Sequence, residues 1–370
     1  MTSQGANSSD TVSDIRQHQL RRWAEQVLRI HPDETASVHW QVVSGDASFR
    51  RFFRIRMMPE SRSLIAMDSP PERENNAQFI ALSALLRRQG LLVPEVFAAD
   101  LEQGFLLVED LGDALYGNIY QGPDRDQALS AALDSLIRLQ RLDQGPAAAE
   151  AARLIPPYDA ERLGMELDLF REWLLERLLG LTLPDGTVKL LRSARTLLID
   201  NALSQPQVPV HRDFHSRNLL WCDGRTALVD FQDALRGPLS YDLASLLRDC
   251  YVRFPEAEIQ RWREDYLERL GRSGILTEVP DAHTFARQFD RMAIQRQLKA
   301  VGIFARLKLR DAKPGYLADI PVVLRYLVDL CLADAELNAL GHYLAEQVVP
   351  VADIRIQQLI SEPTSEPTRT

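Results

Sequence analysis

The sequence of 370 residues has few cysteines, no excess of positive charge and no long apolar run. Its three cysteines, Cys222, Cys250 and Cys331, lie far apart and lack the short spacings of a zinc site or a disulfide framework. A net charge of −9 argues against a basic face built for nucleic acid or for an anionic membrane. The ligand expected from this balance is a small molecule.

No stretch has enough consecutive apolar residues to cross a bilayer. The polar, acidic start MTSQGANSSDTVSD lacks the basic residues and apolar core of a secretory signal. These features predict a cytoplasmic protein with no membrane partner and no nucleic-acid partner, present as a monomer or a weak homodimer.

A β-rich block occupies the first third of the chain. Short segments rich in β-formers predict five strands, with one helix inserted after the third. The helix is expected over residues 71–89, and an amphipathic helix over residues 14–30 precedes the block. The five strand segments are VHWQVV, FRRFFRI, SLIAM, EVFAAD and FLLVED.

From residue 111 onward the pattern is mostly helical. The spacing of apolar residues predicts helices over 124–142, 159–179 and 187–203, and again after residue 241. A compact β island with the runs VPV, NLLWC and TALVDF interrupts them. This order predicts the α+β class, with a five-stranded antiparallel sheet in the first part and helices in the second.

The segment HRDFHSRN is followed, twelve residues after its last position, by Asp230 in VDFQD. Phosphoryl transfer from ATP needs an aspartate that orients the attacking hydroxyl and accepts its proton, and oxygen ligands for Mg²⁺. Asp213 suits the first role, and Asn218 and Asp230 suit the second. The amide of Asn218 supplies a hard oxygen without adding repulsion against the triphosphate. The pattern therefore predicts a kinase that uses ATP and Mg²⁺.

HRDFHSRN with DFQD resembles the catalytic and metal-binding motifs of the aminoglycoside phosphotransferase and choline kinase family, relatives of the protein kinases. The resemblance implies a two-lobed protein-kinase-like fold, with a nucleotide-binding lobe over residues 1–110 and a catalytic, substrate-binding lobe over 111–370. It also implies the roles of single residues. Asp213 is the catalytic base, Asn218 and Asp230 bind Mg²⁺, His211 and Arg212 brace the loop, and Asp242 in GPLSYDLASLLRD supports the loop without being catalytic.

Nucleotide contacts are expected in the first lobe. The turn SGDAS lies where kinases place a phosphate-covering loop, so Ser44, Gly45 and Ser48 are candidate phosphate donors. With a single glycine, an ordinary hairpin turn is the alternative. FLLVEDLGD resembles the hinge strand, in which main-chain groups around Glu109 and Leu111 would read the adenine edge.

The phosphate-binding lysine that kinases carry on the third strand is absent, because the first lysine of this chain is Lys189. Glu72 and Glu74 are possible counterparts of the glutamate that pairs with it. An arginine of the second strand is the candidate replacement. The candidates are Arg50 and Arg54 on one face of the strand and Arg51 on the other.

Several segments, among them GDASFRRFFRI, LIAMDSPPE, HRDFHSRNLL and QRQLKAVGIFARL, resemble the bacterial anomeric amino-sugar kinases. This resemblance implies phosphorylation of C1 of N-acetylmuramate and N-acetylglucosamine in peptidoglycan recycling. Candidate sugar contacts are Phe214, His215 and Gln232, together with Arg296 and Lys299 one helical turn apart. A cation there would pair with the lactyl carboxylate of muramate, whereas a solvated helix face is the alternative.

Two other functions stay open at this point. A kinase of another hydroxylated acceptor, such as an aminoglycoside, choline or homoserine, would need the same motifs. A catalytically silent nucleotide-binding scaffold would explain the missing lysine and the poor glycine loop. ATP turnover distinguishes the scaffold from the kinases.

Overall fold

The computed structural model describes residues 8–30, 38–43, 49–58 and 63–361. The chain divides into two compact units. Unit 1 comprises Met1–Ala114 and Leu220–Gln232, and unit 2 comprises Leu115–Leu219 and Asp233–Thr370. This division differs from the sequence-based boundary after residue 110, because a segment from the middle of the chain belongs to unit 1.

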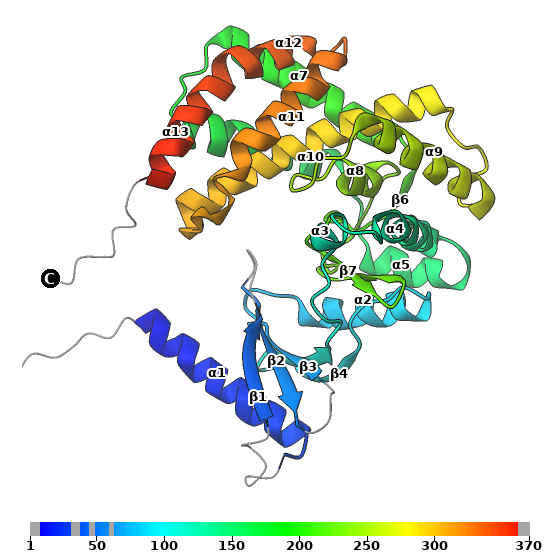
Figure 1. Cartoon of the computed structure of the whole chain (residues 1–370), viewed down its shortest axis with the longest axis vertical. Helices are drawn as coiled ribbons and strands as arrows, with labels where there is room; N and C mark the ends of the chain where they lie inside the picture. The colour runs from blue at the N-terminus through cyan, green and yellow to red at the C-terminus, as the bar shows by residue number, and fades with distance from the viewer. Residues whose placement is uncertain (1–7, 31–37, 44–48, 59–62, 362–370) are drawn as a thin grey trace, which may run out of the picture. The chain divides into compact units, whose positions relative to one another are not determined.

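Unit 1 contains a five-stranded sheet in the order β1-β2-β3-β5-β4, and all neighbouring strands are antiparallel (Figure 1). The predicted sheet is confirmed. In the register, Phe53 faces Ala66, and Ala66 faces Leu107, so these buried side chains form one row across the sheet. The strands are β1 (Val38–Val43), β2 (Arg51–Met57), β3 (Ser63–Asp68), β4 (Val96–Asp100) and β5 (Phe105–Glu109).

Two helices accompany the sheet. In α1 (Ser8–Val27), Leu20 and Ala24 are fully buried in the same apolar cluster as the row of the sheet. Helix α2 (Asn76–Arg88) begins five residues later than expected, because residues 70–74 form a turn and Asn75 caps the helix. The side chain of Asn75 accepts the N–H of Gln78 at 3.1 Å.

The hairpin of β7 (Leu219–Cys222) and β8 (Arg225–Leu228) explains why residues 220–232 belong to unit 1. The N–H of Leu228 donates to the carbonyl of Leu92 at 2.8 Å. After the hairpin, the ring of Phe231 stacks on Phe79, with centroids 5.0 Å apart. Leu92 and Phe79 lie more than a hundred positions before the residues that they contact, so local patterns do not predict the pairing.

Unit 2 is built around the 30-residue helix α10 (Ala282–Asp311). It packs against α6 (Ala160–Leu169), η4 (Phe170–Leu178), α7 (Asp185–Leu203), α8 (Tyr241–Leu247) and α11 (Asp319–Ala333). Asp281 starts the helix, because its carboxylate accepts the N–H groups of His283 and Thr284. A Cβ atom on Gly302 would lie 2.6 Å from the backbone of Leu169, so this glycine permits the close approach of α10 to the end of α6.

The other helices and strands of unit 2 follow the predicted order. Residues 159–179, expected as one helix, form α6 and then the π-helix η4. The expected β island is divided, since β6 pairs with β9 in unit 2. The helices are α3 (Tyr116–Ile119), α4 (Arg125–Gln140), α5 (Ala148–Leu154), α6 (Ala160–Leu169), η4 (Phe170–Leu178), α7 (Asp185–Leu203), α8 (Tyr241–Leu247), α9 (Glu256–Ser273), α11 (Asp319–Ala333), α12 (Asn338–Tyr343), η6 (Leu344–Val348) and α13 (Val349–Ser361). Short 3₁₀ turns are η2 (Arg141–Asp143), η3 (Gly145–Ala147) and η5 (Pro314–Tyr316), and the strands are β6 (Gln207–Val210) and β9 (Leu235–Pro238).

In the described part of the chain, none of the helices has the length and apolar character needed to cross a membrane.

Candidate active site

The loop that carries Asp213 follows β6 in unit 2 and is fixed by the carboxylate of Asp242. The N–H groups of His211 and Arg212 donate to the two oxygens of Asp242 at 2.6 and 3.0 Å. Asp242 is fully buried, and burial raises its pKa to about 7, although these two hydrogen bonds act to lower it. Arg212 adopts a positive φ of 78°, which the bonds to Asp242 help to hold.

Asp213 is half-buried, and its main chain is tied into the loop. Its carbonyl accepts the N–H of His215 and the side-chain amide N–H of Asn218, both at 3.0 Å. Its own N–H donates to Nδ1 of His211 at 3.3 Å. These bonds fix the position of Asp213 and orient the amide of Asn218 so that its nitrogen points to the loop.

The charge of Asp213 is set by the side chains around it. Burial acts to raise the pKa of this carboxyl, but nearby positive charges outweigh burial and hold the pKa well below its usual range. The basic side chains that lower it are, from the largest effect to the smallest, Lys299, His215, Arg296 and Arg212. Asp213 is therefore ionised at neutral pH, as a proton acceptor must be.

Glu166 on α6 is the central carboxylate of this region, and it is only 9% exposed. It accepts hydrogen bonds from Nη2 of Arg212 at 2.5 Å and from the hydroxyl of Tyr158. Nζ of Lys299 lies 3.2 Å away, and Nε2 of Gln295 donates at 3.3 Å. Burial acts to raise the pKa of Glu166, but the charges of Lys299 and Arg212 lower it below the usual range. Glu166 thus holds two of the cations that surround Asp213.

Arg296 and Lys299 are both on α10 and are both 8% exposed, but their surroundings differ. The amine of Lys299 is close to Glu166 and also donates to the hydroxyl of Tyr241 at 3.4 Å. The guanidinium of Arg296 lies over the ring of Tyr241, 5.2 Å from its centroid, and its Nε is shielded from solvent without a hydrogen-bond partner among the described residues. Lys299 has internal partners, whereas Arg296 has none of comparable strength in the described part of the chain.

The two aromatic candidates in the loop have different environments. Phe214 is fully buried and packs edge-on against His211, so it is part of the core of unit 2. His215 is partly exposed, and its ring meets the edge of Tyr251 at a centroid distance of 5.5 Å.

Asp230 and Gln232 belong to unit 1 and follow β8. Asp230 adopts a positive φ of 64°, and Nε2 of Gln232 donates to its carboxylate at 2.7 Å. Between them, Phe231 is buried and stacks on Phe79. The buried aromatic residue fixes the backbone that presents the Asp230 carboxylate.

Arg50 of unit 1 is buried and pairs with Glu74, one of the two glutamates expected from the sequence. Its Nη2 lies 2.8 Å from Oε2 of Glu74, its Nε is 3.4 Å from the hydroxyl of Ser69, and the arginine is only 4% exposed. The guanidinium also lies 5.7 Å from the ring centroid of Phe79. This pair is a cation and carboxylate of the kind expected from the kinase lysine and glutamate.

The other two arginines have structural partners. Arg51 pairs with Asp68 at 2.5 Å. Arg54 pairs with Asp110 and Asp113, both at 2.6 Å. All three arginines thus have carboxylate partners, and contact of Arg50 with a nucleotide phosphate stays a prediction.

The remaining nucleotide candidates are only partly described. Ser44, Gly45 and Ser48 lie outside the described residues. The N–H of Glu109 donates to the carbonyl of Glu95 at 2.8 Å, and the carbonyl of Leu111 accepts the thiol of Cys222 at 3.2 Å. Adenine contact at Glu109 and Leu111 stays a prediction.

A family model described as the phosphotransferase enzyme family matches residues 39–285. The chain belongs to this phosphotransferase family. A Pseudomonas putida protein named N-acetylmuramate/N-acetylglucosamine kinase is 38% identical over 338 residues, which cover 90% of this chain and 97% of that protein. A Neisseria meningitidis protein of the same name is 36% identical, with 90% and 96% covered.

The fold has relatives among solved structures. Plasmodium vivax ethanolamine kinase superposes with a TM-score of 0.60 at 14% identity, covering 88% of this chain and 96% of that chain. This likeness confirms the protein-kinase-like fold expected from the sequence. With its family and its kinase-named relatives, the phosphotransferase is an ATP-dependent kinase.

The oxygen ligands of the phosphotransferase suit a divalent ion. Because the amide nitrogen of Asn218 donates to Asp213, its oxygen is available as a ligand. Within the described ranges, no three His, Cys, Asp or Glu side chains form a metal site. A Mg²⁺ ion would therefore take further ligands from nucleotide phosphates and water.

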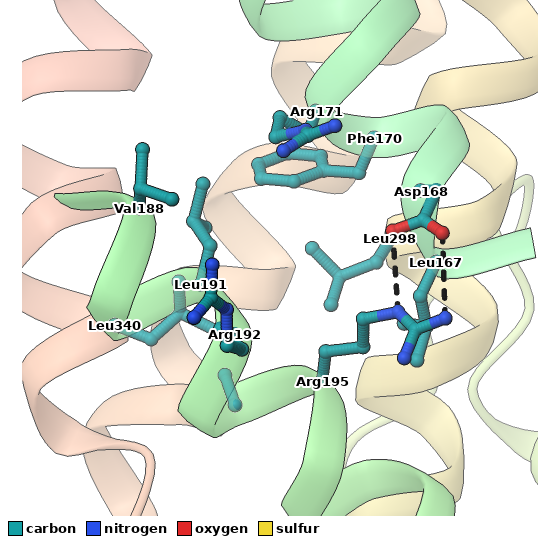
Figure 2. Close-up of a pocket in the computed structure, with 11 residues that line it drawn as sticks. Leu167, Asp168, Phe170, Arg171, Val188, Leu191, Arg192, Arg195, Leu298 and Leu340 are labelled. Atoms are coloured by element: carbon teal, nitrogen blue, oxygen red, sulfur yellow. Dashed lines mark hydrogen bonds and ion pairs between the residues drawn. The ribbon is translucent and has the colours of Figure 1, made fainter. Parts of the chain in front are cut away.

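A cavity of about 310 Å³ in unit 2 is lined by residues of α6, η4, α7, α10 and α12. Figure 2 shows Arg195 paired with Asp168 at its edge, at 3.2 Å, and none of the predicted site residues line it. The motif chemistry, and not this cavity, therefore locates the active site. Its lining residues are Leu167, Asp168, Phe170, Arg171, Val188, Leu191, Arg192, Ala194, Arg195, Leu298 and Leu340.

Sequence reasoning missed Glu166, because it belongs to no motif and lies 47 positions before Asp213. One signal was present in its helix. Leu163 and Leu167 place Glu166 on the buried side of α6, where a carboxylate needs a positively charged partner.

Proposed function

We propose that this phosphotransferase transfers the γ-phosphoryl group of ATP to the C1 hydroxyl of N-acetylmuramate and of N-acetylglucosamine. The products would be the sugar 1-phosphates, made for peptidoglycan recycling. The observation that carries the proposal is the similarity, over nearly the whole length of both chains, to proteins named for these two sugars. The ionised Asp213 in a fixed loop supports the same reaction.

In this reaction Asp213 orients the C1 hydroxyl and accepts its proton while the oxygen bonds to the γ-phosphorus and the bond to ADP breaks. The anomeric hydroxyl is more acidic than an ordinary alcohol, so a carboxylate with a low pKa is a sufficient base. Asp242 and Glu166 hold the loop from two sides.

The residues proposed for the nucleotide are Asn218, Asp230 and Arg50. Asn218 and Asp230 would hold Mg²⁺, which would neutralise charge on the phosphates. Arg50, oriented by Glu74, would contact a phosphate in place of the missing lysine. A buried cation with its carboxylate partner favours an active kinase over a silent scaffold.

An acceptor panel tests the proposal. The purified protein would be incubated with ATP, Mg²⁺ and single acceptors, and ADP release would be followed. N-Acetylmuramate and N-acetylglucosamine should be phosphorylated, whereas methyl N-acetylglucosaminide, in which C1 is blocked, should not. Turnover of the methyl glycoside would refute the assignment to C1. Turnover only with choline, homoserine or an aminoglycoside would refute the sugar acceptor.

A further inference from the structure

The basic side chains around Asp213 are not equivalent. Glu166 binds Arg212 at 2.5 Å and Lys299 at 3.2 Å, so both side chains have a close carboxylate partner inside unit 2. Lys299 has a second partner in the hydroxyl of Tyr241. These two cations serve to position the loop.

Among the residues that the structure describes, Arg296 has no such close partner. It is 8% exposed, its Nε is shielded from solvent without a hydrogen-bond partner, and it lies over the face of Tyr241 at 5.2 Å. Burial acts to lower the pKa of Arg296, but interactions with Tyr241, Cys250, Asp213 and Asp242 raise it, so the guanidinium keeps its charge. A buried charge without a close ion-pair partner is costly, and proteins rarely keep one without a use.

The neighbouring carboxylates act on Arg296 through their charges, without a close ion pair among the described residues. The two oxygens of Asp242 accept the N–H groups of His211 and Arg212. Asp213 must remain available to the attacking hydroxyl. A ligand carboxylate would therefore supply the close ion pair that Arg296 lacks.

The position of Arg296 in the chain favours the acceptor over the phosphoryl group. The family match covers residues 39–285, which include Asp213, Asn218 and Asp230, and it ends before Arg296 on α10. Chemistry common to the family lies within the matched segment, so a residue beyond it suits recognition of this enzyme's own acceptor. A guanidinium also binds a carboxylate with two parallel hydrogen bonds.

We infer that Arg296 binds the lactyl carboxylate of N-acetylmuramate and thereby determines the preference of the enzyme between its two sugars. The inference rests on the proposed function, since it takes N-acetylmuramate as an acceptor. N-Acetylglucosamine lacks the carboxylate and would leave Arg296 without this partner. Lys299, by contrast, positions the loop through Glu166.

Steady-state kinetics on both sugars test this role. Arg296→Gln should lower kcat/KM for N-acetylmuramate by about 100-fold, mainly through KM, because one partner of a desolvated charge pair is removed. For N-acetylglucosamine, kcat/KM should fall far less, because only the effect of Arg296 on the charge of Asp213 is lost. Arg296→Lys should recover part of the loss, since it keeps the charge but not the two-pronged geometry.

Arg306→Gln is the matched control. Arg306 is on the same helix and also has a shielded Nε without a partner among the described residues. It differs from Arg296 in two ways: burial and Arg310 lower its pKa, and it is not among the charges that act on Asp213. The ratio of kcat/KM for the two sugars should stay at the wild-type value in this variant.

A change in the substrate gives the same test without any variant. The methyl ester of N-acetylmuramate removes the negative charge, so wild-type kcat/KM for the ester should fall about 100-fold below that for the acid. In Arg296→Gln, acid and ester should be used almost equally. Equal losses of Arg296→Gln on both sugars, or equal use of acid and ester by the wild type, would overturn the inference and leave the proposed function intact. Turnover of neither sugar by the wild type would overturn both.

Discussion

The pairing of Glu166 with Lys299 and Arg212 can be tested by a double-mutant cycle. Glu166→Gln keeps the shape of the side chain and an acceptor oxygen for Tyr158, but removes the negative charge that lies between two cations. Lys299→Met removes one of these cations and keeps an unbranched apolar stem. In the double variant one charge of each sign is absent, so Arg212 faces a neutral amide.

The magnitude follows from burial. Glu166 is 9% exposed and Lys299 is 8% exposed, so the pair is desolvated. Breaking a buried pair by removing one partner costs about 3–5 kcal/mol, and Gln at position 166 should cost near 3 kcal/mol because it still accepts a hydrogen bond. Lys299→Met should be less harmful, since Glu166 keeps Arg212. The two effects should not add, and their coupling should be about 1–2 kcal/mol, within the range found for residues in contact.

Urea unfolding followed by circular dichroism would measure these changes, since most helices belong to unit 2. The variant Arg306→Gln, which does not touch the network, should unfold near the wild-type midpoint. Additive losses from Glu166→Gln and Lys299→Met would refute the view that these two charges stabilise each other.

Three further predictions concern the chemistry. Asp213→Asn should lower kcat by about 10²–10⁴-fold through loss of the base, with ATP affinity unchanged in a fluorescent-nucleotide titration; unaltered turnover would exclude Asp213 as the base. Arg50→Met should weaken ATP binding by about tenfold, and Arg50→Lys should restore most of it, whereas equal ATP affinity in Arg50→Met and the wild type would exclude phosphate contact. Because positive charges lower the pKa of Asp213, protonation of Asp213 should not reduce activity above about pH 4. Lys299→Met should raise that pKa, so kcat should begin to fall at a higher pH than in the wild type. Coincident pH profiles of the variant and the wild type would contradict this.

The strands of unit 1 are predictable because each is short and rich in β-formers and is bounded by turn residues. Each of the five expected strand segments overlaps an observed strand, and the limits agree to within two residues. Helix limits are also close where a cap is visible in the sequence. Asp159 caps α6, for example, and its carboxylate accepts the N–H of Arg162 at 2.9 Å.

Long-range pairing was not predictable from local patterns. The expected β island is divided between the units, because β6 pairs with β9 while the hairpin of β7 and β8 bonds to Leu92. Neither partner has a sequence signal that identifies the other. The same limit explains why the expected domain boundary after residue 110 differs from the observed division into two units.

At the site, the motif residues were identified because phosphoryl transfer restricts both residue type and spacing. Arg50 and Glu74 were both among the residues expected to replace the lysine and glutamate of kinases, and the structure pairs them at 2.8 Å, while phosphate contact stays a prediction. The different environments of Arg296 and Lys299 could not be foreseen. They depend on which side of α10 faces Glu166, and this follows from helix packing.

The most direct test of the account is the ³¹P NMR spectrum of the products formed from ATP, Mg²⁺ and each of the two sugars. Phosphorylation at C1 should give a new phosphomonoester signal split into a doublet by the single anomeric proton. A triplet from the two protons at C6, or no new signal with either sugar, would contradict it.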